Sequence, residues 1–267
     1  MNWLAALVTA VAALAGAQQL RLEDVTARVD RYLSEYANGL ANVVAEETYR
    51  QRALGAPGLP LIRILRSEYA LTFVNGEGFG YRDTFEVDGQ PVRGRDQRLQ
   101  RMLESGGRQQ ARQISELNAR YNLASERFAR SINVPTTALE LLQPKYRKRF
   151  SVRRLGSASL GDSLGWVLEF RERSRPTIIK TPKGKNQASR IEALVDPDTG
   201  VVRRTTISWE NTVGSIVVEY GPAEGISVLV PVTMREQFTI AVGDEVNTDA
   251  TYTNYRTFQT SGRLIEP

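Results

Sequence analysis

The chain has no histidine and no cysteine among its 267 residues. Without imidazole or thiol groups it can form no Ser-His-Asp or Cys-His catalytic system and no ordinary zinc or copper site. Without cysteine no disulfide bond stabilises the fold, so the burial of apolar side chains must do so. Any catalysis would depend on carboxylates, Tyr, Lys, Arg or a cofactor, and no motif in the sequence indicates a cofactor or a metal ion.

Charge is missing from the N-terminus. Residues 3–17 are uncharged and mostly apolar, and they end in the small residues Ala-Gly-Ala. This pattern is typical of a secretory signal peptide, which predicts that residues 1–17 are removed by cleavage before Gln18. The run is shorter than the roughly 20 residues that cross a membrane as a helix, and a retained signal anchor is the alternative. We therefore expect an exported protein of the periplasm or cell envelope, with one domain at residues 18–267.

Helical spacing of apolar residues begins directly after this segment. From Leu22 to about Arg52 the spacing of three and four residues predicts one long amphipathic helix that needs a partner surface. Its apolar face comprises Leu22, Val25, Val29, Tyr32, Tyr36, Leu40 and Val43. The glycines and prolines of residues 55–60 end the pattern. Further helices are predicted at 95–105, 109–128 and 135–142.

Period-two alternation predicts strands in the rest of the chain. They are expected at 61–74, 78–87, 146–155, 165–173, 189–195, 201–209, 213–220, 226–240 and 250–259. The short turns between them indicate an antiparallel meander. The predicted fold class is α+β: a curved antiparallel sheet, or incomplete β-barrel, covered by the N-terminal amphipathic helix and a central helical block.

Positive charge is concentrated in one segment. Residues 93–154 hold 15 Lys or Arg and 5 Asp or Glu, whereas the whole chain has a net charge of +5. Such a basic segment can attract anionic lipid headgroups, or it can be a solvated helical surface. The few aromatic residues within it, Tyr121, Phe128, Tyr146 and Phe150, argue against nucleic-acid binding, which needs stacking side chains.

Several short motifs resemble catalytic or phosphate-binding sequences. Residues 161–165 match G-x-S-x-G, and residues 198–200 spell the Asp-Thr-Gly of aspartic proteases. The first lacks its histidine partner and the second lacks a second copy, so both are interpreted as turns between strands. The glycines at 76–80 and 183–185 precede no helix, and they are interpreted as loops.

Carboxylates are the remaining catalytic material. A pair about 5 to 9 Å apart could hydrolyse a glycosidic bond. The strand carboxylates alternate with apolar residues as a solvated strand face does, and the two on the predicted helix point to different sides, so no catalytic residue is assigned. The carboxylates considered are Glu46, Glu47, Asp83, Glu86, Asp88, Glu169 and Glu172.

Four aromatic residues are candidates for lining a ligand site. Trp166 and Phe170 lie four residues apart on one predicted strand and so share a face. Trp209 and Tyr220 are expected at equivalent ends of neighbouring strands. The four side chains could line the inner side of a curved sheet, or they could be ordinary core.

The C-terminal half resembles a group of uncharacterised secreted bacterial proteins and, more distantly, the LolA/LolB-like envelope carriers. The resemblance rests on the turn at 193–204, which contains Asp-Pro-Asp-Thr-Gly, and on residues 216–220, 230–236 and 250–256. It implies an incomplete antiparallel barrel closed by helices, with an apolar cavity that accepts acyl chains and no catalytic residue.

Together these observations predict a non-enzymatic binding or carrier protein for a lipid or another apolar ligand. One alternative is an envelope scaffold or protein-interaction module that uses the basic face of residues 93–154. A hydrolase that uses paired carboxylates is the third possibility.

Overall fold

The structure is a computed structural model that describes residues 20–40, 43–54, 60–74, 77–94, 120–123, 134–181, 183–210, 212–241 and 244–257. The predicted signal peptide lies outside the described residues. So do the predicted helix at 95–105 and most of that at 109–128; the described residues 120–123 of the latter form a turn.

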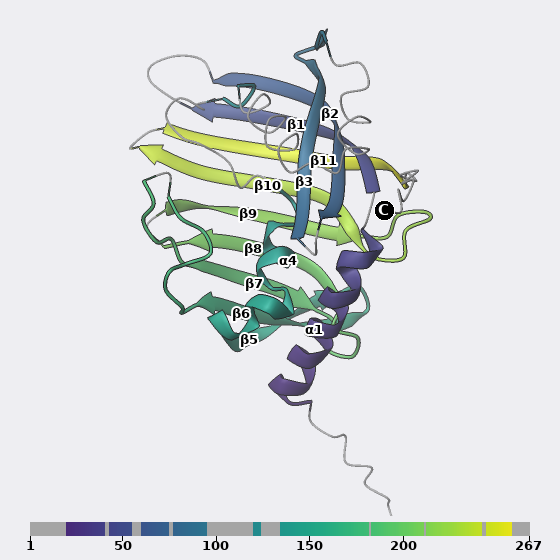
Figure 1. The fold of residues 1–267 in the computed structure, drawn as a ribbon, viewed down its shortest axis with the longest axis vertical. Helices are drawn as coiled ribbons and strands as arrows, with labels where there is room; N and C mark the ends of the chain where they lie inside the picture. Colours follow the sequence, from purple (N-terminus) through teal and green to yellow (C-terminus); the bar gives the residue numbers. More distant parts are fainter. Residues whose placement is uncertain are drawn as a thin grey trace, which may run out of the picture.

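One antiparallel sheet of 11 strands forms most of the described structure (Figure 1). Its strands lie in the order β4-β3-β2-β1-β11-β10-β9-β8-β7-β6-β5. The chain therefore forms two meanders, β1–β4 and β5–β11, which meet where β1 pairs with β11. The strands are β1 (Val43–Leu54), β2 (Leu61–Val74), β3 (Glu77–Val87), β4 (Gln90–Pro91), β5 (Phe150–Leu160), β6 (Ser163–Glu172), β7 (Ser189–Val195), β8 (Val202–Trp209), β9 (Thr212–Gly221), β10 (Val230–Ala241) and β11 (Asp244–Thr257).

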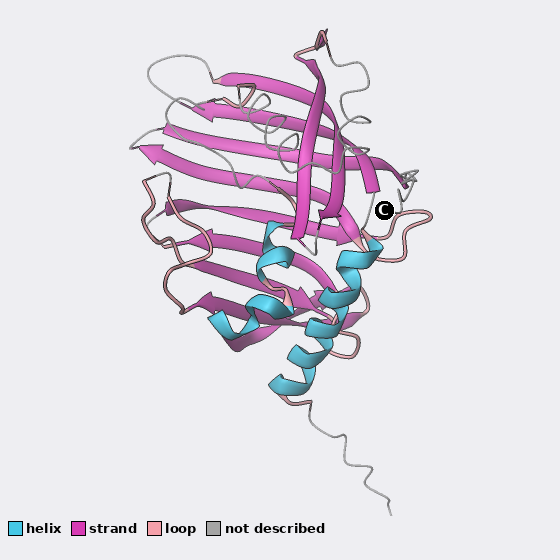
Figure 2. Cartoon of the chain, in the orientation of Figure 1, coloured by secondary structure: helices cyan, strands magenta, loops and turns pink. Residues whose placement is uncertain are grey.

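The sheet is open and curved, with β2 and β3 turning away from the direction of β5–β10. The helices α1 (Leu22–Gly39) and α4 (Thr137–Leu141) and the 3-10 helix η1 (Pro144–Arg149) lie over the half formed by β5–β9 (Figure 2). We call the face on which they lie the inner face. The predicted curved sheet is thus confirmed, whereas the described helices cover only part of it.

The predicted first helix is wrong in its second half. The helix ends at Gly39, and β1 begins at Val43. Val43 fits the helical spacing, but from there on alternate residues are buried in the sheet, ending with Tyr49 and Gln51. The pattern of the sequence allows both structures, and pairing of β1 with β2 and β11 selects the strand.

The amphipathic face of α1 does pack on the sheet, as predicted. Its residues Val25, Val29, Leu33, Tyr36 and Leu40 are buried. Arg28 Nη1 donates a hydrogen bond to the carbonyl oxygen of Pro197, 2.6 Å away, in the turn between β7 and β8. Among the described residues, no helix is long and apolar enough to cross a membrane.

The later strands agree with the predicted alternation, with shifted ends. β5 begins at Phe150 rather than at 146, because residues 144–149 form η1, and β11 begins at Asp244 rather than at 250. Residues 161–162 form the turn between β5 and β6, and residues 197–199 form the turn between β7 and β8. Both catalytic-looking motifs are therefore turns, as predicted.

Candidate functional site

The inner face has two differently built halves. Over β5–β9 it is apolar and packs against the helices, and its buried residues include Leu168, Phe170, Ile191, Ala193, Ile207, Ile216 and Val218. Over β10, β11 and β1–β3 the buried residues of the same face include Glu47, Gln51, Ser67, Arg82, Thr84, Glu236 and Thr248. Burial of so many polar groups is uncommon in a protein core.

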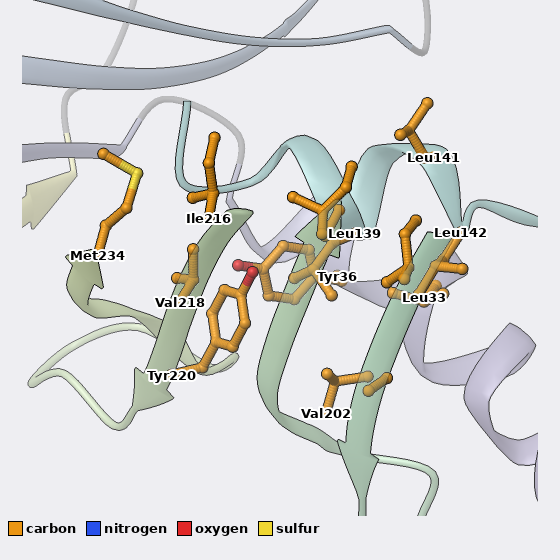
Figure 3. Packing of buried hydrophobic residues seen from close by; sticks show 14 of the residues in the cluster. Leu33, Tyr36, Leu139, Leu141, Leu142, Val202, Ile216, Val218, Tyr220 and Met234 are labelled. Carbon is orange, nitrogen blue, oxygen red and sulfur yellow. The ribbon is translucent and has the colours of Figure 1, made fainter. Parts of the chain in front are cut away.

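Tyrosine side chains lie along the boundary between these halves. We call them the interior tyrosines: Tyr32 and Tyr36 on α1, Tyr69 on β2, Tyr220 on β9, and Tyr252 and Tyr255 on β11. The ring centroids of Tyr32 and Tyr36 are 5.6 Å apart, and those of Tyr69 and Tyr252 are 5.5 Å apart. Figure 3 shows the hydroxyl groups of Tyr36 and Tyr220 directed toward each other. Residues from four distant parts of the chain thus meet at one place.

Some hydroxyl groups of this cluster have partners. Tyr220 Oη donates a hydrogen bond to the carbonyl oxygen of Pro135 at 2.9 Å and lies 3.1 Å from Thr205 Oγ1. Tyr255 Oη donates to the carbonyl oxygen of Pro231. These bonds attach the cluster to the segment before α4 and to the start of β10.

Three other hydroxyl groups are buried without a partner. Within the described structure, Oη of Tyr32, Tyr36 and Tyr69 has no hydrogen-bond partner. A buried polar group left in this state costs about 1–3 kcal/mol, so such groups are uncommon in native cores unless a ligand or water meets them. The three hydroxyl groups are therefore the best candidates for contacts with a bound molecule.

Burial also determines the ionisation state of these groups. It raises the pKa of Tyr36 and of Tyr69 well above the ordinary value, and the neighbouring tyrosines raise the pKa of Tyr36 further. Arg82 acts in the opposite direction on Tyr69 without overcoming burial. Both phenols are consequently neutral at physiological pH and can donate a proton to an acceptor atom.

A buried ion pair lies beside the cluster. Arg82 on β3 binds Glu47 on β1 with two hydrogen bonds, of which the Nη2 to Oε1 bond is 2.7 Å long. The guanidinium carbon lies 4.0 Å from the ring centroid of Tyr49, whose hydroxyl donates to Glu236 Oε2 at 2.9 Å. Arg82, Glu47, Tyr49 and Glu236 therefore form a charged and hydrogen-bonded wall next to the tyrosines.

Local features of the chain support this arrangement. A Cβ atom at Gly80 would lie 2.1 Å from Tyr69 Oη, so glycine leaves the space that this hydroxyl occupies. Gln51 Nε2 donates to the carbonyl oxygen of Tyr121, and Gln51 Oε1 accepts from the backbone N–H of Leu123. The turn at 120–123 is thereby attached to the inner face.

The four predicted lining residues all lie on the inner face but not together. Phe170, Trp209 and Tyr220 are buried, and Trp166 is partly buried with the Arg154 guanidinium 3.9 Å from the centroid of its ring. Trp209 stacks on Phe238 with a centroid distance of 6.0 Å. In the β8–β9 hairpin, Trp209 pairs with Thr212 next to the turn, whereas Arg204 pairs with Glu219 at the other end. Trp209 and Tyr220 therefore lie at opposite ends of the hairpin. The expectation of equivalent ends is wrong, because consecutive antiparallel strands reverse direction.

The expectation that the strand carboxylates form a solvated face is wrong for Asp83, Glu169 and Glu172, which are buried. Glu47, which was expected on a helix, is buried too. Glu46 and Glu47 lie on a strand and not on a helix. The side-chain hydrogen bond from Arg153 and the charge of Arg190 hold the pKa of Glu169 below its ordinary value. No group of acidic side chains in the described residues is arranged to hold a metal ion.

The sequence analysis placed Tyr32 and Tyr36 on the apolar face of the first helix and named Tyr220 as a candidate lining residue. It missed Tyr69, Tyr252 and Tyr255. Tyrosine is abundant, with 10 residues in a chain that has 8 phenylalanines and 3 tryptophans. That excess was the available indication, because tyrosine adds to the apolar ring a hydroxyl that must be satisfied. Nothing local shows that residues as far apart as 36 and 252 would meet.

No protein-family model matches the sequence, and no curated protein matches it. Solved structures do show a likeness. A DUF1329 family protein from Desulfovibrio piger is 12% identical with a TM-score of 0.45, covering 91% of this chain and 94% of its own. A domain described as an outer membrane lipoprotein-sorting protein, from Vibrio parahaemolyticus, is 10% identical with a TM-score of 0.45, covering 89% and 93%.

A LolA superfamily protein from Nitrosomonas europaea is 8% identical with a TM-score of 0.36, and the match covers 89% of this chain and 97% of that one. A protein of the LolA superfamily, which the C-terminal motifs resemble, is thus among the solved structures to which this chain is similar. At TM-scores below 0.5 the likeness is distant, and it says nothing about a ligand.

Proposed function

We propose that the protein is a non-enzymatic binding or carrier protein of the cell envelope for a lipid or another apolar molecule with a polar end. The observation that supports this proposal is the set of buried hydroxyl groups of Tyr32, Tyr36 and Tyr69, which lack partners in the described structure. They lie between an apolar wall and a charged one, a combination that suits an amphipathic ligand.

The chemistry of these groups suggests which part of the ligand they contact. Neutral phenols donate hydrogen bonds, so the ligand group should be an acceptor, such as the carbonyl or carboxylate oxygen of an acyl chain. Within the ion pair, the charges of Arg82 and Glu47 neutralise each other. Of the predicted lining residues, Tyr220 belongs to the interior tyrosines, and Trp166, Phe170 and Trp209 are proposed to extend the apolar wall.

Tyrosine-to-phenylalanine variants test the proposal, because they remove the hydroxyl group and keep the ring. Tyr36→Phe and Tyr69→Phe should weaken binding of a fluorescent fatty acid by roughly 2- to 10-fold, the worth of one hydrogen bond. Their stability should be unchanged or raised, since the hydroxyl groups have no protein partner to lose. Tyr220→Phe is the matched control: it loses the contacts with Pro135 and Thr205, and its main effect should be on stability.

Native mass spectrometry of protein recovered from an envelope fraction, and N-terminal sequencing of the same material, complete the test. The proposal expects co-purifying lipid and a chain that begins at or near Gln18. Absence of probe binding and of co-purifying lipid in the unmodified protein would refute the carrier function. Soluble cytoplasmic protein that retains Met1 would refute the envelope location.

A further inference from the structure

Strand β5 is an open edge of the sheet. Among the described strands it pairs only with β6, and it is 11 residues long. The opposite edge is formed by β4, which has two residues. A long edge strand presents unpaired backbone N–H and C=O groups, to which another strand can add.

The register shows which backbone groups are available. The N–H of Arg173 donates to the carbonyl oxygen of Arg149 at 2.7 Å, and the register continues with Phe150 opposite Glu172. Because bonded and non-bonded pairs alternate in an antiparallel ladder, Ser151 and Arg153 direct their backbone groups to β6. Val152 and Arg154 direct theirs to the open side, whereas the N–H of Phe150 already donates to the carbonyl oxygen of Arg147 at the end of η1.

Few of the usual protective features block this edge. β5 contains no proline, and its single irregularity is the register shift between Arg154 and Gly156. The segment from Ser151 to Arg154 is regular, and the backbone groups of Val152 and Arg154 are available for pairing. What this edge does have is positive charge.

Residues 144–173 contain eight Lys or Arg and three Asp or Glu. Glu169 and Glu172 are buried and contact Arg153 and Arg149, so these carboxylates are not presented to a partner. Arg171 lies on the neighbouring strand β6, opposite Ser151, and Arg173 directly follows that strand. Arg173 Nε donates to Ser151 Oγ at 3.0 Å.

We propose that β5 is a docking edge for an extended, acidic peptide segment of a partner protein, which adds to the sheet as a twelfth strand. Backbone hydrogen bonds to Val152 and Arg154 would hold the segment, and its carboxylates would meet the Arg171 and Arg173 side chains. A second copy of this chain is disfavoured as the occupant, because pairing two β5 edges would bring like charges together. This edge lies outside the interior ligand site and does not depend on it.

The test uses the mature chain and a labelled octapeptide of alternating Glu and Val, with an alternating Lys and Val peptide as the control of opposite charge. A third peptide, the acidic one with alternate backbone nitrogens methylated, keeps the charge but cannot pair along its edge. Fluorescence anisotropy should show binding of the first peptide only. Arg171→Glu with Arg173→Glu should weaken it roughly tenfold at low salt. Lys183→Glu with Lys185→Glu, the same charge change on the loop between β6 and β7, is the matched control and should have a smaller effect.

Amide hydrogen exchange resolves the contact directly. The peptide should slow amide exchange at Val152 and Arg154. Exchange at Phe150, Ser151 and Arg153 should stay unchanged, because the amide of Phe150 already bonds to Arg147 and the other two bond to β6. Peptide binding that does not slow hydrogen exchange at the edge amides of Val152 and Arg154 would overturn the proposal. Equal binding of the methylated peptide, or binding to anionic vesicles but not to the acidic peptide, would overturn it too and assign the charge to non-specific attraction.

Discussion

Arg82 and Glu47 are joined by two hydrogen bonds on the inner face of the sheet, from β3 to β1 across the intervening strand β2. On the intervening strand, Ser67 lies opposite Glu47 and Tyr69 lies opposite Arg82. Both charged side chains are almost completely buried. The pair therefore links β3 to β1 across β2.

A double-mutant cycle tests the contribution of this pair to stability. Arg82→Met alone should lower the free energy of unfolding by about 3–5 kcal/mol, because it leaves a buried carboxylate without its cation. Glu47→Leu combined with Arg82→Met should recover the greater part of that loss, since no charge then remains buried. Urea unfolding of the single and double variants measures the coupling, and additive losses would show that the two residues act independently.

Attachment of α1 to the sheet depends on a close backbone contact. Gly200 has a φ of +79°, and a Cβ atom there would lie 2.3 Å from the backbone carbon of Arg28. Gly200→Ala should therefore destabilise the protein by clearly more than about 1 kcal/mol, combining backbone strain with a steric clash. Gly225→Ala, at a φ of +74° in open space, has the strain without the clash and should cost less. If thermal unfolding shows the same loss of stability in both variants, the contact between Gly200 and α1 contributes nothing to stability.

Because the interior tyrosines are buried, we expect the folded protein to lose stability at alkaline pH. Burial raises the pKa of Tyr36, Tyr69 and Tyr252 above the ordinary value of 10.0, so the folded protein binds more protons than the unfolded chain at high pH. This contribution is fully present below pH 10 and is lost as the pH rises further. Tyrosinate absorbance should therefore appear in two phases, the second coinciding with loss of the near-ultraviolet circular dichroism signal. A single phase near pH 10, with the fold retained, would contradict the buried cluster.

The two tryptophans of the predicted lining differ in a way that variants can measure. Trp209→Ala should cost the roughly 3–5 kcal/mol of a buried aromatic residue, because Trp209 stacks on Phe238. Trp166→Ala should cost less, since Trp166 is only partly buried. If both rings line the ligand site, both variants also weaken uptake of a fluorescent fatty acid. Unchanged uptake in both would remove these residues from the proposed wall.

Local sequence patterns predicted most of the strands. Residues 189–195 were expected as a strand and form β7 with the same bounds, because Ile191, Ala193 and Val195 alternate toward the core between two clear turns. The turn at 161–162 was equally predictable: Gly161 adopts a φ of +63°, which glycine tolerates without strain. Where the spacing of the apolar residues and the turn residues indicate the same strand, the local sequence is sufficient to predict it.

The same local information failed where two structures fit one pattern. Residues after Leu40 satisfy helical and strand spacing alike, and only pairing with β2 and β11 makes them β1. The error extended to the candidate site, because Glu47 was placed on a helix surface and not beside Arg82.

The sequence by itself determined that histidine and cysteine chemistry is absent. It also determined most of the antiparallel strands with their turns, and the amphipathic first helix. These follow from residue types and from spacings of a few residues. Only the tertiary structure decided that Tyr36, Tyr69 and Tyr220 converge beside Arg82 and Glu47, and that β5 is left as an edge. Such contacts join residues up to about two hundred positions apart, and they arise from the order in which strands pair, which no local pattern specifies.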